Sequence, residues 1–238
     1  VEGGQTNCDQ LETQVDLTPK APKSPGKALI INGWRNGEPG RISMGYDVVN
    51  MYGVLNNLGG FETSFYGYNS LGFLEADGEP TVKDIEEWFQ NEASQLTAGE
   101  TLFVYITGHG GADEAGNEIL GGFTEAMLRS WLEGVDEDIN VIFVGDGCQS
   151  GSLRDSLSEV ADVVVVSTSD LDSGYGDLDF REMVPDGWVR DPNPDDEGGE
   201  FTSGFAQGLF QVLANPAGVA AVQAEADASG ENFWNQLV

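Results

Sequence analysis

Short, continuous apolar runs separated by helical patterns are the feature that most limits how this chain can fold. Such runs lie at residues 28–31, Thr101–Thr107, 140–145 and Val163–Ser167, and a weaker strand pattern lies at residues 62–68. Helical periodicity covers residues 44–58, 81–96, 123–133, 203–213 and 218–237. Strands that lack polar alternation are buried on both faces, which is typical of parallel sheets covered by helices. The expected fold class is therefore α/β, a three-layer α/β/α sandwich with a mostly parallel sheet.

The 238 residues divide into a short arm and one domain. Residues 1–26 are polar and contain three prolines between positions 19 and 25, which is typical of a linker or an extended arm. Residues 27–238 carry the strand and helix patterns and are expected to form a single domain. Within it, the Asp-, Gly- and Pro-rich segment 169–199 follows the end of a strand, where parallel sheets place their ligand sites.

The charge of the chain excludes several classes of partner. Forty-one acidic residues face ten basic ones, for a formal net charge of −31. Nucleic acids and anionic lipid surfaces are bound through Lys and Arg, so neither is an expected partner. Self-repulsion of this size is tolerated where salt or divalent cations screen it, which indicates a salt-adapted source or bound calcium. We expect an extracytoplasmic, secreted protein, although the cytoplasm of a halophile would select the same composition.

Two glycine-rich motifs follow two of the predicted strands. TGHGG occupies residues 107–111, and DGCQSGS occupies residues 146–152. One predicted helix separates the two strands, and Cys148 follows His109 by 39 positions. A strand–helix–strand unit of this length usually places its strands side by side, so both motifs should emerge at the same edge of the sheet. We therefore expect His109, the only histidine of the chain, to lie near Cys148.

These residue types suit nucleophilic catalysis. A thiol becomes a strong nucleophile when it loses its proton, which a nearby imidazole or helix N-terminus favours. The N–H groups of Gly110 and Cys148 could stabilise an oxyanion. A single cysteine is more often a small buried hydrophobe, and a single histidine is more often structural. Their joint position after neighbouring strands weakens that structural reading and leaves a Cys–His site equally open.

The two motifs resemble those of the caspase-fold cysteine peptidases, which include caspases, legumains and metacaspases. His-Gly after one strand and Asp-x-Cys-x-Ser-Gly after the next is the pairing that these families share. Asn32-Gly33-Trp34, the helix positions that follow it and the run at 163–169 are most similar to legumains. Together these features cover residues 27–213.

The resemblance implies a role for several residues. His109 would be the general acid and base, Cys148 the nucleophile, and Gly110 part of the oxyanion hole. Asp146 matches an acidic residue of the primary specificity pocket, and Arg41 lies about two residues from the pocket arginine of legumains. An acidic pocket alone would select Arg or Lys, whereas an acid paired with arginine would suit Asn or Asp. Polar groups for the pocket wall would come from Ser167, Ser169 and Asp172.

The expected function is that of a cysteine endopeptidase acting on polypeptides, which requires no cofactor. A transpeptidase would use the same two residues. A catalytically silent, caspase-like interaction domain is another alternative. Calcium binding is also open, because Asp170, Asp172, Asp177 and Asp179 have calcium-like oxygen spacing without a complete EF-hand loop.

Overall fold

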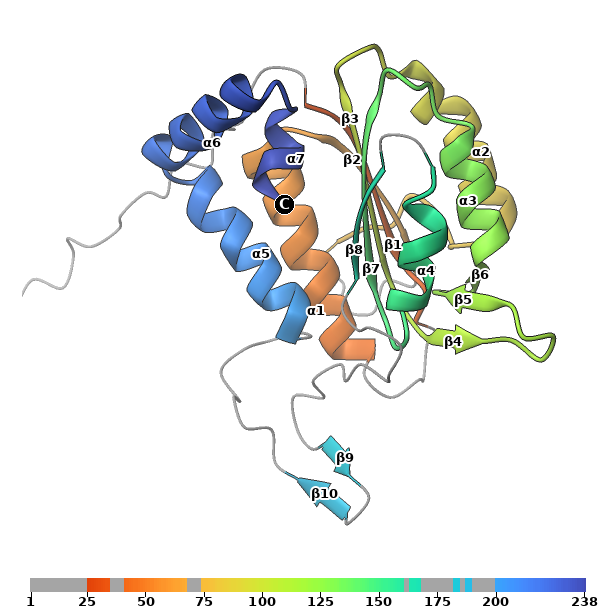
Figure 1. The fold of residues 1–238 in the computed structure, drawn as a ribbon. Helices are drawn as coiled ribbons and strands as arrows, with labels where there is room; N and C mark the ends of the chain where they lie inside the picture. Colours follow the sequence, from red (N-terminus) through yellow and green to blue (C-terminus); the bar gives the residue numbers. More distant parts are fainter. Residues whose placement is uncertain are drawn as a thin grey trace, which may run out of the picture.

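The central element is a parallel sheet with strand order β2-β1-β3-β7-β8. The computed structural model describes residues 25–34, 41–67, 74–160, 163–167, 182–184, 187–189 and 200–238. Within this part the strands of the sheet are β1 (Gly26–Asn32), β2 (Glu62–Gly67), β3 (Thr101–Thr107), β7 (Asn140–Asp146) and β8 (Val163–Ser167). Helices cover both faces (Figure 1). The predicted three-layer α/β class is confirmed.

The register of the sheet aligns the ends of its strands. Asn32 pairs with Thr107 between β1 and β3, and Thr107 pairs with Asp146 between β3 and β7. Gly145 pairs with Ser167 between β7 and β8. Because all these pairings are parallel, the loops after β1, β3 and β7 leave from one edge of the sheet.

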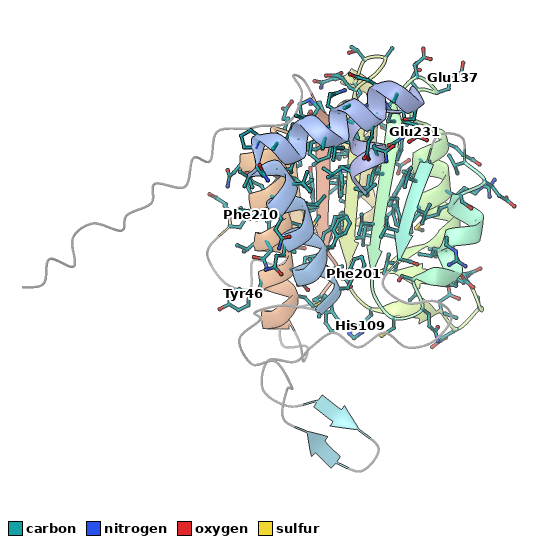
Figure 2. All side chains as sticks on the ribbon, turned by 60° about the vertical axis from the view of Figure 1, so that its left-hand side comes forward. Tyr46, His109, Glu137, Phe201, Phe210 and Glu231 are labelled. Atoms are coloured by element: carbon teal, nitrogen blue, oxygen red, sulfur yellow. The ribbon has the colours of Figure 1, made fainter. Side chains whose placement is uncertain are left out.

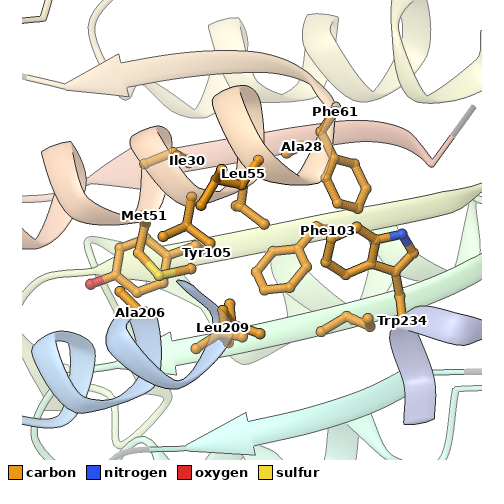
Figure 3. Close-up of a cluster of buried hydrophobic side chains, with 14 of the residues drawn as sticks. Ala28, Ile30, Met51, Leu55, Phe61, Phe103, Tyr105, Ala206, Leu209 and Trp234 are labelled. Atoms are coloured by element: carbon orange, nitrogen blue, oxygen red, sulfur yellow. The ribbon is translucent and has the colours of Figure 1, made fainter. Parts of the chain in front are cut away.

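One face of the sheet is covered by α1 (Arg41–Tyr52), a π-helix η1 (Gly53–Gly59), α5 (Glu200–Leu213) and α7 (Phe233–Leu237). Helix α6 (Pro216–Ser229) joins the last two. Figure 3 shows Met51, Leu55 and Leu209 packed against Phe103 and Tyr105 of the central strand. Each fully buried aliphatic or aromatic side chain contributes about 1.5–3 kcal/mol.

The other face is covered by α2 (Val82–Asn91), α3 (Glu125–Glu133) and α4 (Gly151–Leu157), as Figure 1 shows. The alternate residues of β3, Leu102, Val104 and Ile106, are fully buried or nearly so on this side. β3 is therefore apolar on both faces, which is why its sequence reads as a continuous run.

Several helices differ from the sequence prediction. The predicted helix 44–58 is α1 followed by the π-helix η1. The predicted helix 81–96 ends at Asn91 and continues only as the 3-10 turn η2 (Ala93–Gln95). The predicted helix 218–237 is two helices, because Gly230 adopts the left-handed conformation, with φ 78°, and ends α6.

Two small sheets were not predicted. β4 (Gly110–Ala112), β5 (Glu118–Leu120) and β6 (Phe123–Thr124) form an antiparallel sheet that begins at the histidine motif. β9 (Glu182–Val184) pairs with β10 (Gly187–Val189) inside the irregular segment 169–199.

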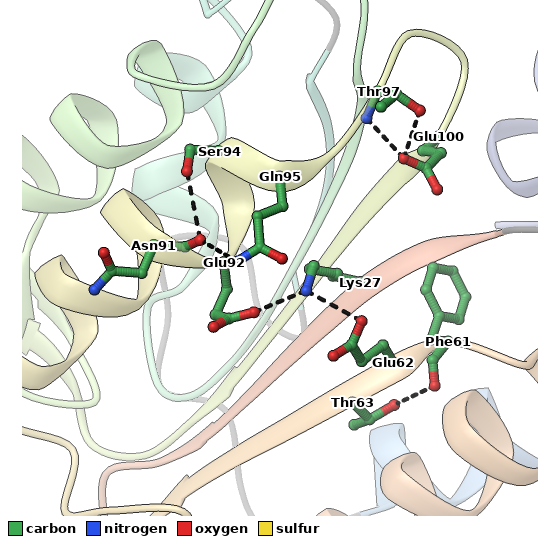
Figure 4. A network of polar contacts seen from close by, with 10 residues as sticks. All are labelled: Lys27, Phe61, Glu62, Thr63, Asn91, Glu92, Ser94, Gln95, Thr97 and Glu100. Carbon is green, nitrogen blue, oxygen red and sulfur yellow. Dashed lines mark hydrogen bonds and ion pairs between the residues drawn. The ribbon is translucent and has the colours of Figure 1, made fainter.

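A buried lysine ties the first strands to α2 at the far end of the sheet. Lys27 is 8% exposed, and its Nζ lies 2.7 Å from Glu92 Oε2 and 3.1 Å from Glu62 Oε2 (Figure 4). Burial alone would lower the pKa of Lys27, but the hydrogen bonds to Glu92 and Glu62 outweigh it and the pKa is raised. The ammonium group therefore stays charged and paired.

None of the helices in the described residues is individually long and apolar enough to cross a bilayer. Gly204–Leu213 and Pro216–Ser229 reach that length and composition only as a pair, and the pair is bent by 93°.

Candidate active site

The pairing of β3 with β7 brings the two glycine-rich motifs together. Thr107 at the end of β3 is the register partner of Asp146 at the end of β7. His109 lies two residues after Thr107, and Cys148 lies two residues after Asp146. The N–H of Gly108 donates to the carbonyl oxygen of Asp146 at 3.1 Å, so the parallel pairing continues into the loops. Figure 2 shows His109 at this end of the sheet, opposite the end where Glu137 and Glu231 lie.

Glycine is required where the two motifs touch. A Cβ atom on Gly110 would lie 1.8 Å from the carbonyl oxygen of Cys148, and one on Gly147 would lie 2.4 Å from the carbonyl oxygen of Gly108. Separations below 3.0 Å do not occur between real Cβ atoms and their neighbours. The backbone of the histidine motif is thus in direct contact with that of the cysteine motif, as the sequence predicts.

The backbone after Cys148 is held in an uncommon conformation. Gln149 has φ 57°, in the left-handed region, which costs a residue other than glycine about 1–2 kcal/mol. Its carbonyl oxygen accepts hydrogen bonds from Ser152 Oγ at 2.7 Å and from the N–H of Ser152 at 3.0 Å. Such outliers occur often at functional sites. Helix α4 follows at Gly151.

The histidine side chain contacts an aromatic residue from the loop after β1. His109 is exposed, Cys148 is half-buried, and the ring of Trp34 lies 4.0 Å from the His109 ring between centroids, at an interplanar angle of 46°. The N–H of Gly121 donates to the carbonyl oxygen of His109 at 2.9 Å. Trp34 carries a sequence signal, an aromatic residue two positions beyond a strand end, but the sequence did not indicate its partner.

Asp146 sits above a buried polar cluster. Its Oδ2 accepts hydrogen bonds from the hydroxyls of Tyr105, at 2.9 Å, and of Thr202 on α5. The two hydroxyl oxygens are 2.8 Å apart, and both residues are fully buried. Burial, and then the negative charges of Asp146 and Asp47, raise the pKa of Tyr105 well above its usual value. Sequence reasoning missed Tyr105 and Thr202 because one lies inside an apolar run and the other on a distant helix.

The structure describes only some of the remaining predicted site residues. Ser167 is half-buried at the end of β8, on the same edge of the sheet as the two motifs. Arg41 is the first residue of α1, and its side chain lies outside the described part of the structure. Ser169 and Asp172, with the calcium-like loop from Asp170 to Asp179, also lie outside the described residues.

The described ranges contain no side-chain cluster suited to metal binding. Among these residues, no group of three or more His, Cys, Asp or Glu side chains could hold a metal ion. The calcium prediction concerns residues outside these ranges and stays a prediction.

Comparison with known proteins finds a relative over part of the chain. No protein-family model matches the chain. Metacaspase-7 of Arabidopsis thaliana is 26% identical over 121 residues, an alignment that covers 45% of this chain and 30% of the plant protein. The chain therefore spans less than a third of the length of that relative. Over the matched part, this chain is similar to a caspase-like cysteine peptidase.

Proposed function

We propose that the chain is a cysteine endopeptidase that uses Cys148 as nucleophile and His109 as general acid and base. The observation that carries this proposal is the contact of the two motifs, in which Gly110 lies against the backbone of Cys148 at the end of paired strands. The only histidine of the chain and a half-buried cysteine thus belong to adjoining loops. The similarity to a plant metacaspase supports the same reaction class.

The reaction would proceed through a thioester. The Cys148 sulfur attacks the peptide carbonyl carbon, and the thiol proton passes to His109. His109 then gives this proton to the leaving amine as the C–N bond breaks. Water, deprotonated by His109, attacks the thioester, and the thiol and a carboxylic acid are released. The N–H groups of Gly110 and Cys148 are the proposed donors to the oxyanion, and each such donor is worth about 3–4 kcal/mol of barrier.

The proposed primary specificity depends on Asp146 and Arg41. Asp146 stands at the end of β7, two residues before the nucleophile, and its Oδ2 is fixed by Tyr105 and Thr202. A fixed carboxylate in the pocket would select Arg or Lys before the cleaved bond. If Arg41 completes the pocket, as the legumain resemblance implies, Asn or Asp would be selected instead. Ser167, Ser169 and Asp172 are proposed for the pocket wall.

A fluorogenic peptide library that varies the residue before the cleaved bond tests the proposal. We expect the wild-type protein to cleave one class, basic or Asn/Asp, and Cys148→Ala and His109→Ala to cleave none. Circular dichroism on both variants would show that the fold is retained. Assays with and without calcium, at low and high salt, would establish whether either is needed.

Three outcomes would overturn parts of the proposal. Hydrolysis by the Cys148→Ala variant at the wild-type rate would remove Cys148 as the nucleophile. Joined peptides in place of hydrolysis products, detected by mass spectrometry when an amine acceptor is added, would assign a transpeptidase to the same two residues. No cleavage by any form under any condition would favour the silent interaction domain.

A further inference from the structure

Trp34 lies against the proposed base and is not accounted for by the reaction itself. Its indole ring is 4.0 Å from the His109 ring between centroids, inclined at 46°. Trp34 is half-buried, whereas the histidine that it touches is exposed. An exposed imidazole can rotate about two side-chain bonds, so a neighbouring ring on one side removes part of that freedom.

Trp34 is anchored to the same backbone that carries His109. The N–H of Trp34 donates to Asn32 Oδ1 at 3.0 Å, and Asn32 is only 1% exposed. The N–H of Gly33 donates to the carbonyl oxygen of Thr107 at 2.8 Å, two residues before the histidine. Trp34 and His109 therefore lie on two loops that are joined by a backbone hydrogen bond.

The loop between β5 and β6 contacts both of these loops. A Cβ atom on Gly33 would lie 2.5 Å from the Cα of Gly121, so the two backbones are in tight contact. Gly121 in turn donates its N–H to the carbonyl oxygen of His109 at 2.9 Å. The loop after β1, the histidine motif and the β5–β6 turn are thus joined to one another through their backbones.

We propose that Trp34 is a positioning residue that holds the His109 imidazole at the orientation needed for proton exchange with the Cys148 thiol. This inference rests on the proposed cysteine peptidase function. Catalytic bases of this kind are usually oriented by a third group. Here the Trp34 ring supplies that orientation by contact with the imidazole. The orientation matters because a side chain displaced by about 1 Å can cost about 100-fold in rate.

Kinetics of Trp34→Ala and Trp34→Phe test the positioning role. We expect Trp34→Ala to lower kcat by about 10–100-fold with KM changed less than about threefold, since the substrate contacts remain and the base is misplaced. Trp34→Phe should recover most of kcat, because it keeps a ring. The indole Nε1 makes no hydrogen bond to any described residue that phenylalanine would lose.

A second readout does not need activity. Because His109 is the only histidine, its imidazole Cε1–H gives a single proton resonance by NMR. In a Cys148→Ala background the indole ring current should displace this resonance from its position in an unfolded control. We expect Trp34→Ala to remove most of that displacement and Trp34→Phe to keep part of it.

Trp131 on α3 provides the matched control. It is also half-buried and in contact with other rings, with centroids 5.3 Å from Phe123 and 5.6 Å from Phe89. Trp131→Ala should destabilise the fold yet leave the His109 resonance and kcat unchanged. A His109 resonance that Trp34→Ala does not move, or an equal loss of kcat in both alanine variants, would overturn the inference. A displaced resonance with no cleavage by wild type would instead overturn the peptidase function.

Discussion

At the scale of single residues, close backbone contact decides which amino acid is tolerated at position 110. A Cβ atom on Gly110 would lie too close to the carbonyl oxygen of Cys148 for any side chain to fit there. Gly208, an exposed residue within α5, has open space around its missing Cβ. The same substitution at the two positions should therefore have opposite effects.

We expect Gly110→Ala to destabilise the fold by about 1–3 kcal/mol, because the motifs must move apart, and to lower kcat/KM at least tenfold. Gly208→Ala should stabilise by about 0.5–1 kcal/mol, since alanine favours the helix, and leave activity unchanged. Urea unfolding and the peptide assay measure both effects. Equal stability changes in the two variants would contradict the close contact.

Tyr105 links the stability of the protein to alkaline pH. Burial, and then the charges of Asp146 and Asp47, raise its pKa, so the folded protein keeps the phenol proton while the unfolded chain releases it near pH 10. The contribution of the raised Tyr105 pKa to the free energy of unfolding is fully present below about pH 10 and is lost as pH rises through the folded-state pKa.

Tyr105→Phe should therefore flatten the fall in unfolding free energy above about pH 10. At neutral pH the variant should be less stable by about 1 kcal/mol, since Asp146 loses a donor. Urea midpoints between pH 7 and pH 11 provide the measurement. Tyr66, whose pKa is raised by burial and by nearby carboxylates led by Asp77, leaves a smaller residual slope in both proteins. Parallel curves for the two proteins would exclude the linkage.

At the scale of elements, local signals were readable from the sequence and non-local ones were not. The cap of α2 is local, because the Thr81 side chain accepts the N–H of Asp84, three residues further on, at 3.1 Å. β3 and β7 were predicted because both are apolar on both faces. The sheet that begins at Gly110 was missed because Gly-Gly-Ala has low strand propensity and is held by its pairing with β5.

The same distinction holds for the site. The two motifs and their contact followed from the order of strands and helices. The ring contact of Trp34 and the hydroxyls beneath Asp146 depend on how distant segments pack, which no local pattern encodes.

Removal of the α2 cap should reduce stability without affecting the site. We expect Thr81→Ala to cost about 1 kcal/mol, because the N–H of Asp84 loses its acceptor. Thr81→Ser retains the hydroxyl and serves as the control, with a loss of a few tenths of a kcal/mol at most. Urea unfolding would show the difference. An equal loss in both variants would indicate that the threonine methyl group, and not the cap, is the stabilising part.

At the scale of the whole molecule, charge repulsion opposes folding. With a net charge of −31, the chain should become more stable as salt shortens the Debye length from about 30 Å at 0.01 M to about 3 Å at 1 M. We expect Tm to rise steadily with NaCl over this range. CaCl2 at matched ionic strength separates screening from binding, because only binding would add a further increase that saturates. A Tm that is independent of NaCl would contradict this account.

The strand order also has a consequence for how the protein is made. In the sheet β2-β1-β3-β7-β8, every strand after β1 is added at an outer edge and none is inserted between two earlier ones. A nascent chain can therefore extend the sheet in the order of translation, because each strand finds its neighbour already synthesised. The loops that carry His109 and Cys148 follow β3 and β7, so both are synthesised before α5. Thr202, whose hydroxyl donates to Asp146, lies on α5 and is synthesised only afterwards, so the two motif loops can meet before this support is in place.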